Sequence, residues 1–561
     1  MQPPLAGLTR RNVVRELTAG VTLLAIAIPL NIGYAQIAGL PATAGLYALI
    51  VPTVIYALAV SSRQLVASPD AAAAALVASS IGGLAAAGTA DYATLAMAQA
   101  IICGVLFILL SVFRLGFLAN FLSKPILVGF VGGLALDILV SQIAKMLGVH
   151  IDSGGEFVDK VAGLVTGIGT TNLVSLTISV LAVAVLLGGR RLLPAVPWAL
   201  VVLIVGTIVV VVADLDDAGV DVLGEVPAGP PVLTWPVIDW STWLVLIPSA
   251  IALTLVTTAE GLLVSRSYGE RRGYATNPNR DLFAFGLGNV AAGASGSFAV
   301  GSSTSRTAAM DQAGSRTQLP SLVLAVGTLL LLLFGTALLA DIPSPAIGAI
   351  VGVAILPLLG IRDFATLWRQ DRFEFAVGAA CFLVTLFVGA IPGILVAFVL
   401  ALINLAKRAA NPAIDVLEAG GEPTDSLLDR APSGAVTAPG VIVIRLAAPL
   451  FFANSSVFAD AVKRAVSAAS DAGHGPVRHV VIDMEAVTDV DVTGAESFES
   501  LLAWLDRERI ELSFSRVRPD ARARLEHLGL LGDRPVSETN RAALRSLADE
   551  AEQDPTDRHG T

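Results

Sequence analysis

The chain has 561 residues, of which 55% are hydrophobic and 15% charged, and its mean hydropathy is +0.75. This composition argues against a soluble enzyme or a nucleic-acid-binding protein and indicates an integral membrane protein. The net charge of −10 belongs to residues 412–561, which carry 15 basic and 25 acidic residues, whereas residues 1–411 carry 21 of each. We therefore expect a membrane domain followed by a soluble domain.

Apolar segments recur along the chain up to residue 408. A helix needs about 20 mostly apolar residues to cross the hydrocarbon core of a bilayer, and by this criterion we expect about fourteen spans, some of them shorter than a full crossing. The expected spans lie near residues 18–36, 44–60, 69–87, 92–113, 125–147, 171–189, 197–213, 242–265, 281–297, 303–316, 320–340, 344–360, 373–390 and 392–407.

The basic residues predict the orientation of these spans. If Arg10, Arg11 and Arg15 lie in the cytoplasm, 18 of the 21 basic residues of the membrane domain fall on that side. The acidic linker at residues 214–231 falls on the opposite side. By the positive-inside rule both termini are cytoplasmic, and we expect a multi-pass protein of the cell inner (plasma) membrane.

The linker at residues 214–240 divides the spans into two repeats of about seven, at about 10–213 and 240–411. The third span of each repeat is interrupted by polar and helix-breaking residues, at 61–76 and at 298–310. An odd number of spans inverts the second repeat in the membrane, and paired interrupted spans are typical of a transporter binding site. The expected fold class is a multi-span α-helical membrane protein with 7+7 inverted repeats and two broken half-helix spans, plus a C-terminal α/β domain.

The second interruption places hydroxyl side chains and an arginine at membrane depth. Non-helical backbone at that depth must be buried in protein or line a watery cavity. Where it becomes a helix, unpaired N–H groups and the positive dipole end face the cavity, and two such ends would form a pocket for an anion. The side chains that would add donors and fixed charge are Ser302, Ser303, Thr304, Ser305 and Arg306.

Less specific interpretations remain open for these residues. Hydroxyl side chains in membrane helices often serve only helix packing. Arg306 could brace the half-helix instead of contacting a ligand. Asp70, at the start of the other half-helix, is also a good cap or first-turn residue, and its carboxylate would repel an anion unless it is protonated or paired.

Glu260 is the lone carboxylate within the span at 242–265. A protonatable group there could couple proton movement to anion movement. The alternative is a glutamate near the membrane face that pairs with Arg266 or another cation. The sequence contains no P-loop, no HExxH motif and no Cys/His ligand spacing, so we expect no catalytic residue, no cofactor and no metal.

Four segments resemble the sulfate permease (SulP) anion transporters. They are IPLNIGYAQIAGLPATAGLYA (28–48), SSRQLVASPDAA (61–72), GNVAAGASGSFAVGSSTSRTA (288–308) and GSRTQLPS (314–321). The resemblance implies a seven-plus-seven inverted repeat, a core domain that moves against a gate domain, and an anion held between the third and tenth spans.

The resemblance also implies roles for individual residues. It matches Tyr34 to the aromatic residue of the first span, Asp70 and Ala71 to the start of the third-span helix, Ser303, Ser305 and Arg306 to the tenth-span site, and Glu260 to a carboxylate often seen in the eighth span. The family commonly has Pro-Gln after the first-span kink, whereas this chain has Pro29 and Leu30, with Asn31 next. A hydrogen bond to substrate is then missing or supplied by Asn31.

Residues 436–550 predict a small cytoplasmic α/β domain, because β-rich runs alternate with helical patterns. It resembles a STAS domain, in which the stretch 490–498 matches a loop-to-helix position where relatives show Asp-Ser-Gly. Thr493 replaces that serine, and it marks either a nucleotide or phosphorylation site or, with Asp491, a plain helix start. We expect a regulatory or dimer-contact module, a homodimer, and a disordered tail at 551–561.

These features predict a secondary active transporter of a small inorganic or organic anion, of the sulfate, bicarbonate or dicarboxylate class, in a transmembrane domain of residues 1–411. The expected partners are the anion, a proton as coupling ion, the lipid bilayer and a second copy of the chain. The alternatives are an anion channel, an exchanger without cation coupling, a sodium-coupled bicarbonate transporter, and a membrane-bound sensor that binds an anion without moving it.

Overall fold

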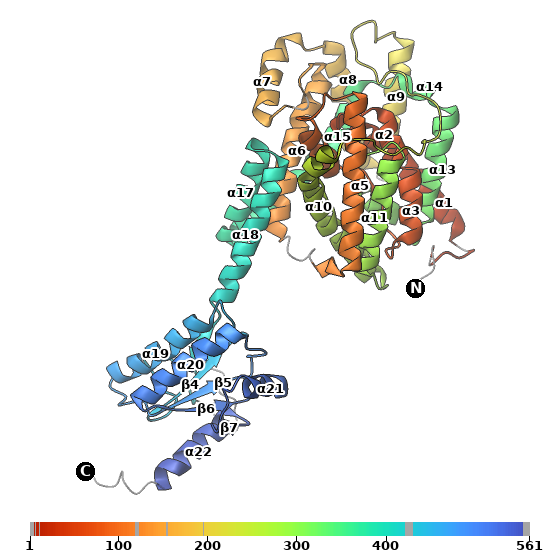
Figure 1. The fold of residues 1–561 in the computed structure, drawn as a ribbon. Coiled ribbons are helices and arrows are strands. Elements are labelled where there is room, and N and C mark those ends of the chain that lie inside the picture. Colours follow the sequence, from red (N-terminus) through yellow and green to blue (C-terminus); the bar gives the residue numbers. More distant parts are fainter. Residues whose placement is uncertain are drawn as a thin grey trace. The chain divides into compact units, whose positions relative to one another are not determined.

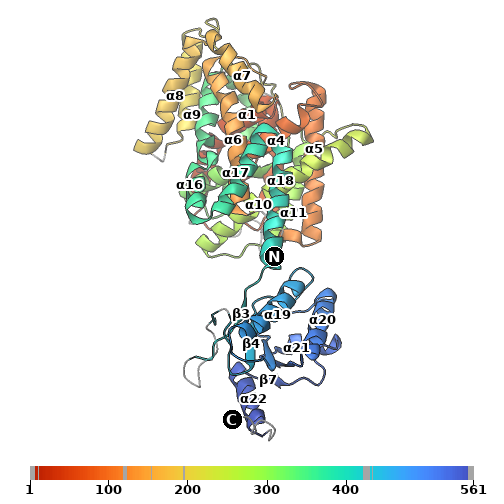
Figure 2. The ribbon, with the colours of Figure 1, turned by 90° about the vertical axis from the view of Figure 1, so that its left-hand side faces the viewer.

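The computed structural model describes residues 5, 7–10, 12–117, 123–152, 155–193, 196–420, 430–432 and 434–553. The chain divides into two compact units, Met1–Ala401 and Leu402–Thr561. The first unit is helical and the second is built on a β-sheet (Figure 1, Figure 2).

The first half of the helical unit contains one broken span among longer helices. Its elements are α1 (Val13–Ile37), α2 (Ala42–Tyr47), α3 (Val51–Ala59), β1 (Ala67–Ser68), α4 (Ala71–Ile81), α5 (Ala90–Val112), α6 (Lys124–Leu147), α7 (Phe157–Gly167), the 3-10 helix η2 (Ile168–Thr170), α8 (Leu173–Leu192) and α9 (Trp198–Val212).

The second half follows the same order. Its elements are α10 (Trp240–Arg272), α11 (Pro278–Ala294), β2 (Gly301–Ser302), α12 (Thr304–Gln312), α13 (Leu319–Phe334), α14 (Ala337–Ala340), α15 (Ser344–Ile355), the 3-10 helix η3 (Leu356–Leu359), α16 (Ile361–Gln370), α17 (Arg372–Phe387) and α18 (Ala390–Ala410). In each half a two-residue strand followed by a short helix occupies the third span, where the sequence predicts an interruption.

Each expected span coincides with at least one helix, while α7 and α16 lie outside the expected spans. By length and composition, six helical segments of the described chain could cross a membrane, and the bent pair Phe157–Thr170 and Leu173–Gly189 would make a seventh. Other apolar helices are shorter, among them α4, α9 and α13. Length alone therefore identifies about half of the spans that the sequence pattern predicts.

Helix contacts repeat between the halves, in agreement with the expected inverted repeats. Helix α5 packs against α10 and α11, and its counterpart α13 packs against α1 and α3. Figure 1 shows α5 beside α11 and α13 beside α1. In the same way α6 packs against α15 and α17, and its counterpart α15 packs against α8 and α6. Such reciprocal contacts are what two related repeats produce.

Glycines allow several of these helices to approach closely. A Cβ at Gly104 of α5 would lie 2.8 Å from the carbonyl oxygen of Gly286 in α11, and a Cβ at Gly286 would lie 2.9 Å from that of Gly104. A Cβ at Gly129 of α6 would lie 2.2 Å from the carbonyl oxygen of Gly378 in α17. The hydrophobic effect does not drive helices together in lipid. Small residues at these crossings instead allow the close van der Waals packing that holds the helices together.

The second unit is a five-stranded sheet with helices on both faces. Its elements are β3 (Ile414–Val416), β4 (Val441–Leu446), α19 (Ser455–Asp471), β5 (His479–Asp483), α20 (Val492–Glu508), β6 (Glu511–Ser515), α21 (Pro519–His527), β7 (Val536–Ser537) and α22 (Asn540–Gln553). The strand order is β3-β4-β5-β6-β7, with β3 antiparallel to β4 and the other pairs parallel.

Alternate residues of the central strands face opposite sides of this sheet. Ile442 and Ile444 of β4 join the core beneath α19 and α20, while Val443 joins a smaller cluster with Ala543 of α22. The mixed sheet covered by helices agrees with the predicted α/β domain, and β3 places its first strand before residue 436. Of the expected tail at 551–561, the first three residues end α22 and the rest lies outside the described residues.

Candidate functional site

The two interrupted spans meet in an antiparallel strand pair inside the helical unit. Ala67 of β1 pairs with Ser302 of β2, and Ser68 pairs with Gly301. The pair is extended by a hydrogen bond of 3.0 Å from the Ser303 N–H to the Val66 carbonyl. Because α4 and α12 begin directly after these strands, their N-termini converge on one region. This is the half-helix arrangement that the sequence predicts.

Asp70 is the N-cap of helix α4. The Asp70 Oδ1 atom accepts a hydrogen bond of 2.7 Å from the Ala73 N–H. The expectation that Asp70 is a helix cap is therefore confirmed. Ala71, the first residue of α4, is buried, so this position offers its backbone and not a reactive side chain.

Ser303 is the N-cap of helix α12, and its hydroxyl oxygen accepts hydrogen bonds from Arg306. The Ser303 Oγ atom accepts hydrogen bonds from the Arg306 Nε at 2.8 Å and from the Arg306 backbone N–H at 3.4 Å. Ser303 thus caps the half-helix and orients the guanidinium. Its hydroxyl proton is left over for donation to another acceptor.

Arg306 is fully buried and joins the two half-helices. Its Nη2 donates a hydrogen bond to the carbonyl oxygen of Pro69, just before α4. Its guanidinium carbon lies 5.5 Å from the ring centroid of Tyr34, which α1 contributes. The Nη1 atom has no hydrogen-bond partner in the described part of the chain. Arg306 therefore braces the site, as one interpretation expected. Its Nη1 is also available to donate a hydrogen bond to a ligand.

Glu260 of α10 lies against the first turn of α12. The Thr304 Oγ1 donates a hydrogen bond of 2.9 Å to the Glu260 Oε1. Arg266 instead forms an ion pair with Glu270 at 2.8 Å, so the alternative in which Arg266 neutralises Glu260 is wrong. The structure brings Glu260 to the site that the half-helices form.

The remaining hydroxyls of the site differ in exposure. Thr304 and Ser305 are exposed at the start of α12, whereas Ser302 is fully buried. The hydroxyl of Ser302 and that of Ser68 in the facing strand have no hydrogen-bond partner among the described residues. Polar groups of both strands are thus available where the half-helices begin.

Two neighbours of the site were not singled out from the sequence. A Cβ at Gly301 would lie 2.6 Å from the Asp70 Oδ2 and 3.4 Å from the Thr257 Oγ1. Glycine at this position therefore lets the Asp70 carboxylate lie directly over strand β2. Thr257 precedes Glu260 by about one turn of α10, a spacing that places both side chains on the same face of the helix.

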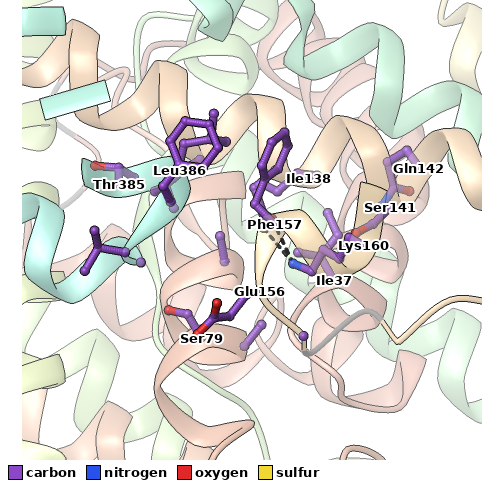
Figure 3. A pocket seen from close by; sticks show the side chains of 18 of the residues that line it. Ile37, Ser79, Ile138, Ser141, Gln142, Glu156, Phe157, Lys160, Thr385 and Leu386 are labelled. Atoms are coloured by element: carbon purple, nitrogen blue, oxygen red, sulfur yellow. Dashed lines mark hydrogen bonds and ion pairs between the residues drawn. The ribbon is translucent and has the colours of Figure 1, made fainter. Parts of the chain in front are cut away.

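A cavity of about 220 Å³ lies at the other end of α4, between α4, α6, α7 and α17 (Figure 3). Lys160 is the only buried residue in α7, and its Nζ contacts the two carboxylate oxygens of Asp137 in α6 at 2.8 and 3.0 Å. Lys145 of α6 donates a hydrogen bond of 3.0 Å to the Gln36 Oε1. Sequence reasoning missed these groups because no local spacing connects residues of α1, α6 and α7.

A second cavity, of about 960 Å³, is lined by α10, by the start of α11 and by the α5–α6 connection. Arg114, Lys124 and Arg266 line it, all of them residues that the positive-inside rule assigns to the cytoplasm. Ala259 and Leu262, which flank Glu260 on α10, also line it. The cavity therefore has basic walls, and it shares helix α10 with Glu260.

The second unit places Thr493 on the exposed first turn of α20. Asp491 caps that helix, because its Oδ1 accepts a hydrogen bond of 2.6 Å from the Gly494 N–H. The helix-start interpretation is therefore confirmed for Asp491. A nucleotide or phosphorylation role for Thr493 stays a prediction.

Asp483, at the end of β5, is the centre of a buried charge cluster. It accepts hydrogen bonds from Arg445 Nε at 2.9 Å, from Arg516 Nε at 3.0 Å and from Asn540 Nδ2 at 3.1 Å. Burial opposes its ionisation, but these donors outweigh burial, so the pKa of the Asp483 carboxyl lies below its ordinary value. The cluster ties β4, β5, β6 and α22 together.

Comparisons with known proteins agree with this architecture. The sulfate permease family matches residues 14–381, and the STAS domain matches residues 434–543. Two probable sulfate transporters of Mycobacterium tuberculosis are 35% and 34% identical over 523 residues, which cover 93% of this chain and 92% of each relative. Low affinity sulfate transporter 3 of Stylosanthes hamata is 30% identical over 537 residues, 90% of this chain and 82% of the relative.

Two solved structures of transporters have folds similar to that of this chain. The murine Slc26a9 anion transporter in the inward-facing state has a TM-score of 0.86 at 21% identity, covering 96% of this chain and 92% of that one. The transmembrane domain of the cyanobacterium bicarbonate transporter BicA has a TM-score of 0.61 at 23% identity, covering 69% of this chain and 98% of that one.

Proposed function

The chain belongs to the sulfate permease family of anion transporters, and from this premise we propose that it is a secondary active transporter that holds a small anion between the N-termini of α4 and α12. The observation that carries the proposal is Arg306, which is fully buried at the junction of the two half-helices and has an unpartnered Nη1. A buried guanidinium with a spare donor beside two positive helix ends favours an oxyanion.

The proposed binding groups are Tyr34, Asp70, Ala71, Ser302, Ser303, Thr304, Ser305 and Arg306. Their geometry gives them different roles. Arg306, Ser302 and Ser305 offer donors to a ligand, whereas Ser303 acts chiefly by orienting the guanidinium and Thr304 donates its hydroxyl proton to Glu260. Tyr34 supplies an aromatic face beside that guanidinium, and Ala71 supplies backbone N–H at the start of α4.

Sulfate is the first substrate to test, because the curated relatives that share 34–35% of their residues with this chain are named probable sulfate transporters. Bicarbonate and dicarboxylates belong to the same proposed class. A pocket formed by helix dipoles and one arginine selects charge more strongly than shape.

We propose that Glu260 carries a coupling proton and that transport follows alternating access. Glu260 lies in α10 with a hydroxyl partner and without a cation within ion-pair distance in the described part of the chain. A carboxyl group in this position can gain and lose a proton as the site opens to either side. The basic cavity beside α10 supports an opening towards the cytoplasmic side.

The membrane placement of the protein completes the proposal. We propose that it lies in the cell inner membrane with both termini cytoplasmic and that it acts as a homodimer. Reporter fusions at each terminus test the orientation, and cross-linking of the purified protein in nanodiscs tests the second copy. A periplasmic or extracellular reporter signal from either terminus would contradict the orientation.

The experiment that tests the function is an uptake screen in proteoliposomes. Labelled sulfate, bicarbonate and a dicarboxylate are offered with no gradient, with an inward proton gradient and with an inward sodium gradient. We expect accumulation of one anion above equilibrium under the proton gradient. Flux that only dissipates a gradient of the anion would favour a channel, dependence on an opposing anion would favour an exchanger, and stimulation by sodium would favour sodium coupling.

A further inference from the structure

We propose that Asp70 is a tethered anion that occupies the N-terminus of α4 and that an incoming anion binds only when this carboxylate takes up a proton. The inference deepens the proposed function, because it concerns the same site, and it rests on that function. It makes Asp70 a second proton-binding group beside Glu260.

The two half-helices start with caps of different charge. The α12 cap is the neutral hydroxyl of Ser303, whereas the α4 cap is the carboxylate of Asp70. Asp70 Oδ1 already accepts the Ala73 N–H at 2.7 Å, and its Oδ2 lies over Gly301 of the facing strand. First-turn N–H groups are the donors that an anion at a helix N-terminus uses. At α4, therefore, the protein's own carboxylate holds the place that a substrate oxygen would take.

The charges around this carboxylate do not balance it. The groups that face it are Arg306 of α12, the Tyr34 hydroxyl of α1 and Glu260 of α10. Helix α6 also packs on α4. Asp137 and Lys145 of α6 line the cavity at the C-terminal end of α4, away from Asp70. One guanidinium thus faces two carboxylates.

Arg306 does not neutralise Asp70 by a direct ion pair. In the described part of the chain its guanidinium contacts the Pro69 carbonyl, the Ser303 hydroxyl and the Tyr34 ring. With both acids ionised the site carries a net charge of about −1, and a like charge a few ångströms away weakens anion binding by roughly 100- to 1,000-fold. An anion therefore needs the site to lose negative charge, and Asp70 is the acid whose oxygen holds the place that a substrate oxygen would take.

Protonation changes Asp70 from a competitor into a donor. A proton from solution on one carboxyl oxygen leaves the other oxygen free to keep the Ala73 hydrogen bond, so the helix stays capped. The new O–H can point towards the bound anion. Binding one anion then takes up one proton at Asp70 in addition to any proton at Glu260, so affinity falls with rising pH by about tenfold per pH unit for each proton.

The test uses purified full-length protein, with sulfate as the probe. Asp70→Asn keeps the size and capping ability of the side chain and removes its charge. Asp70→Ser is a second neutral cap in case the amide does not fold. Isothermal titration from pH 5.5 to 8.5, in buffers of different ionisation enthalpy, gives both the sulfate affinity and the number of protons taken up.

We expect the neutral variants to bind sulfate at least tenfold more tightly than the wild type at pH 8.5 and to take up about one proton fewer per anion. Glu260→Gln is the matched control. This variant should lose the proton uptake that belongs to Glu260, while Asp70 should still take up its proton when sulfate binds. An unchanged proton count in the Asp70 variants, or loss of sulfate binding at every pH in folded variants, would overturn the inference while leaving the proposed transport standing. If the wild type binds neither sulfate, bicarbonate nor a dicarboxylate at any pH, the proposed function falls, and this inference with it.

Discussion

Replacing Arg306 by methionine or lysine separates the two roles that its contacts suggest. Arg306→Met keeps a side chain of similar length but removes the charge and every donor. Arg306→Lys keeps the charge and loses the planar fork that reaches Pro69 and Ser303 together. The difference in anion affinity between these two variants therefore measures the contribution of the positive charge. The difference in anion affinity between Arg306→Lys and the wild type measures the contribution of the planar guanidinium.

The expected magnitudes follow from the contacts. One charge-assisted hydrogen bond from Nη1 to an anion contributes about 1.5–3 kcal/mol. The field of the same charge at about 4 Å, with an effective dielectric constant near 20, contributes up to about 4 kcal/mol. Arg306→Met should thus weaken anion binding by about tenfold to 1,000-fold for every anion tested, because each 1.4 kcal/mol is a factor of ten. Arg306→Lys should recover about tenfold or more of that loss.

The assay is titration of sulfate, bicarbonate and a dicarboxylate into each folded variant, with thermal unfolding as a control for bracing. The Pro69 carbonyl and Ser303 hydroxyl lose a donor in the methionine variant, so its melting temperature should also fall. Equal affinities for wild type, lysine and methionine variants would refute an anion at Arg306. Equal and severe loss in both variants would show that the fork, and not the charge, is what the site needs.

Three further predictions concern other charges of the molecule. Glu260→Gln should weaken uptake driven by an inward proton gradient, because it removes one of the two proposed proton-binding groups, but it should leave anion binding measurable. Unchanged pH-dependent uptake in proteoliposomes would contradict its role as proton carrier. Asp137→Asn should destabilise the protein by about 3–5 kcal/mol, because it leaves the ammonium of Lys160, whose side chain is 8% exposed, without its partner. Thermal unfolding measures this change in stability. The double variant with Lys160→Gln should recover most of the lost stability. If Asp137→Asn is as stable as the wild type, the ion pair does not contribute to stability. Asp483→Asn should destabilise the C-terminal unit at neutral pH. The folded-state pKa of Asp483 is depressed, so its contribution is present above the unfolded value of about 4 and is lost as pH falls through the lower folded value. Pulse proteolysis of the C-terminal unit in the full chain should show a larger difference between wild type and variant at pH 7 than at pH 3, and equal stabilities at pH 7 would contradict this role of Asp483.

The half-helix site could be predicted because its signals are local. A Ser-Pro-Asp sequence before an alanine run and a Gly-Ser-Ser-Thr-Ser sequence before a short helix mark two helix starts whatever surrounds them. The inverted order of the spans then implies that these starts meet. The sequence does not contain the partner of each side chain, so the bonds from Arg306 to Pro69 and from Thr304 to Glu260 emerge only in the folded chain.

Groups joined across distant segments could not be predicted. Lys160 belongs to a helix that otherwise buries no side chain in the described chain, and nothing near it in sequence suggests that it reaches Asp137. Strand β3 has only three residues, too few for a period-2 pattern, and it becomes a strand because β4 offers a free edge. The role of Gly301 likewise depends on the Asp70 carboxylate that lies over it.

The most direct test of the anion site is to locate a heavy analogue of sulfate. Selenate has the shape and charge of sulfate, and its anomalous scattering identifies it in a crystal of the full chain. We predict one strong selenium peak between the N-termini of α4 and α12, within hydrogen-bonding distance of the Arg306 Nη1, and its loss in Arg306→Met crystals grown in the same way. A selenium peak found only elsewhere in the transmembrane unit, with none at Arg306, would contradict the account.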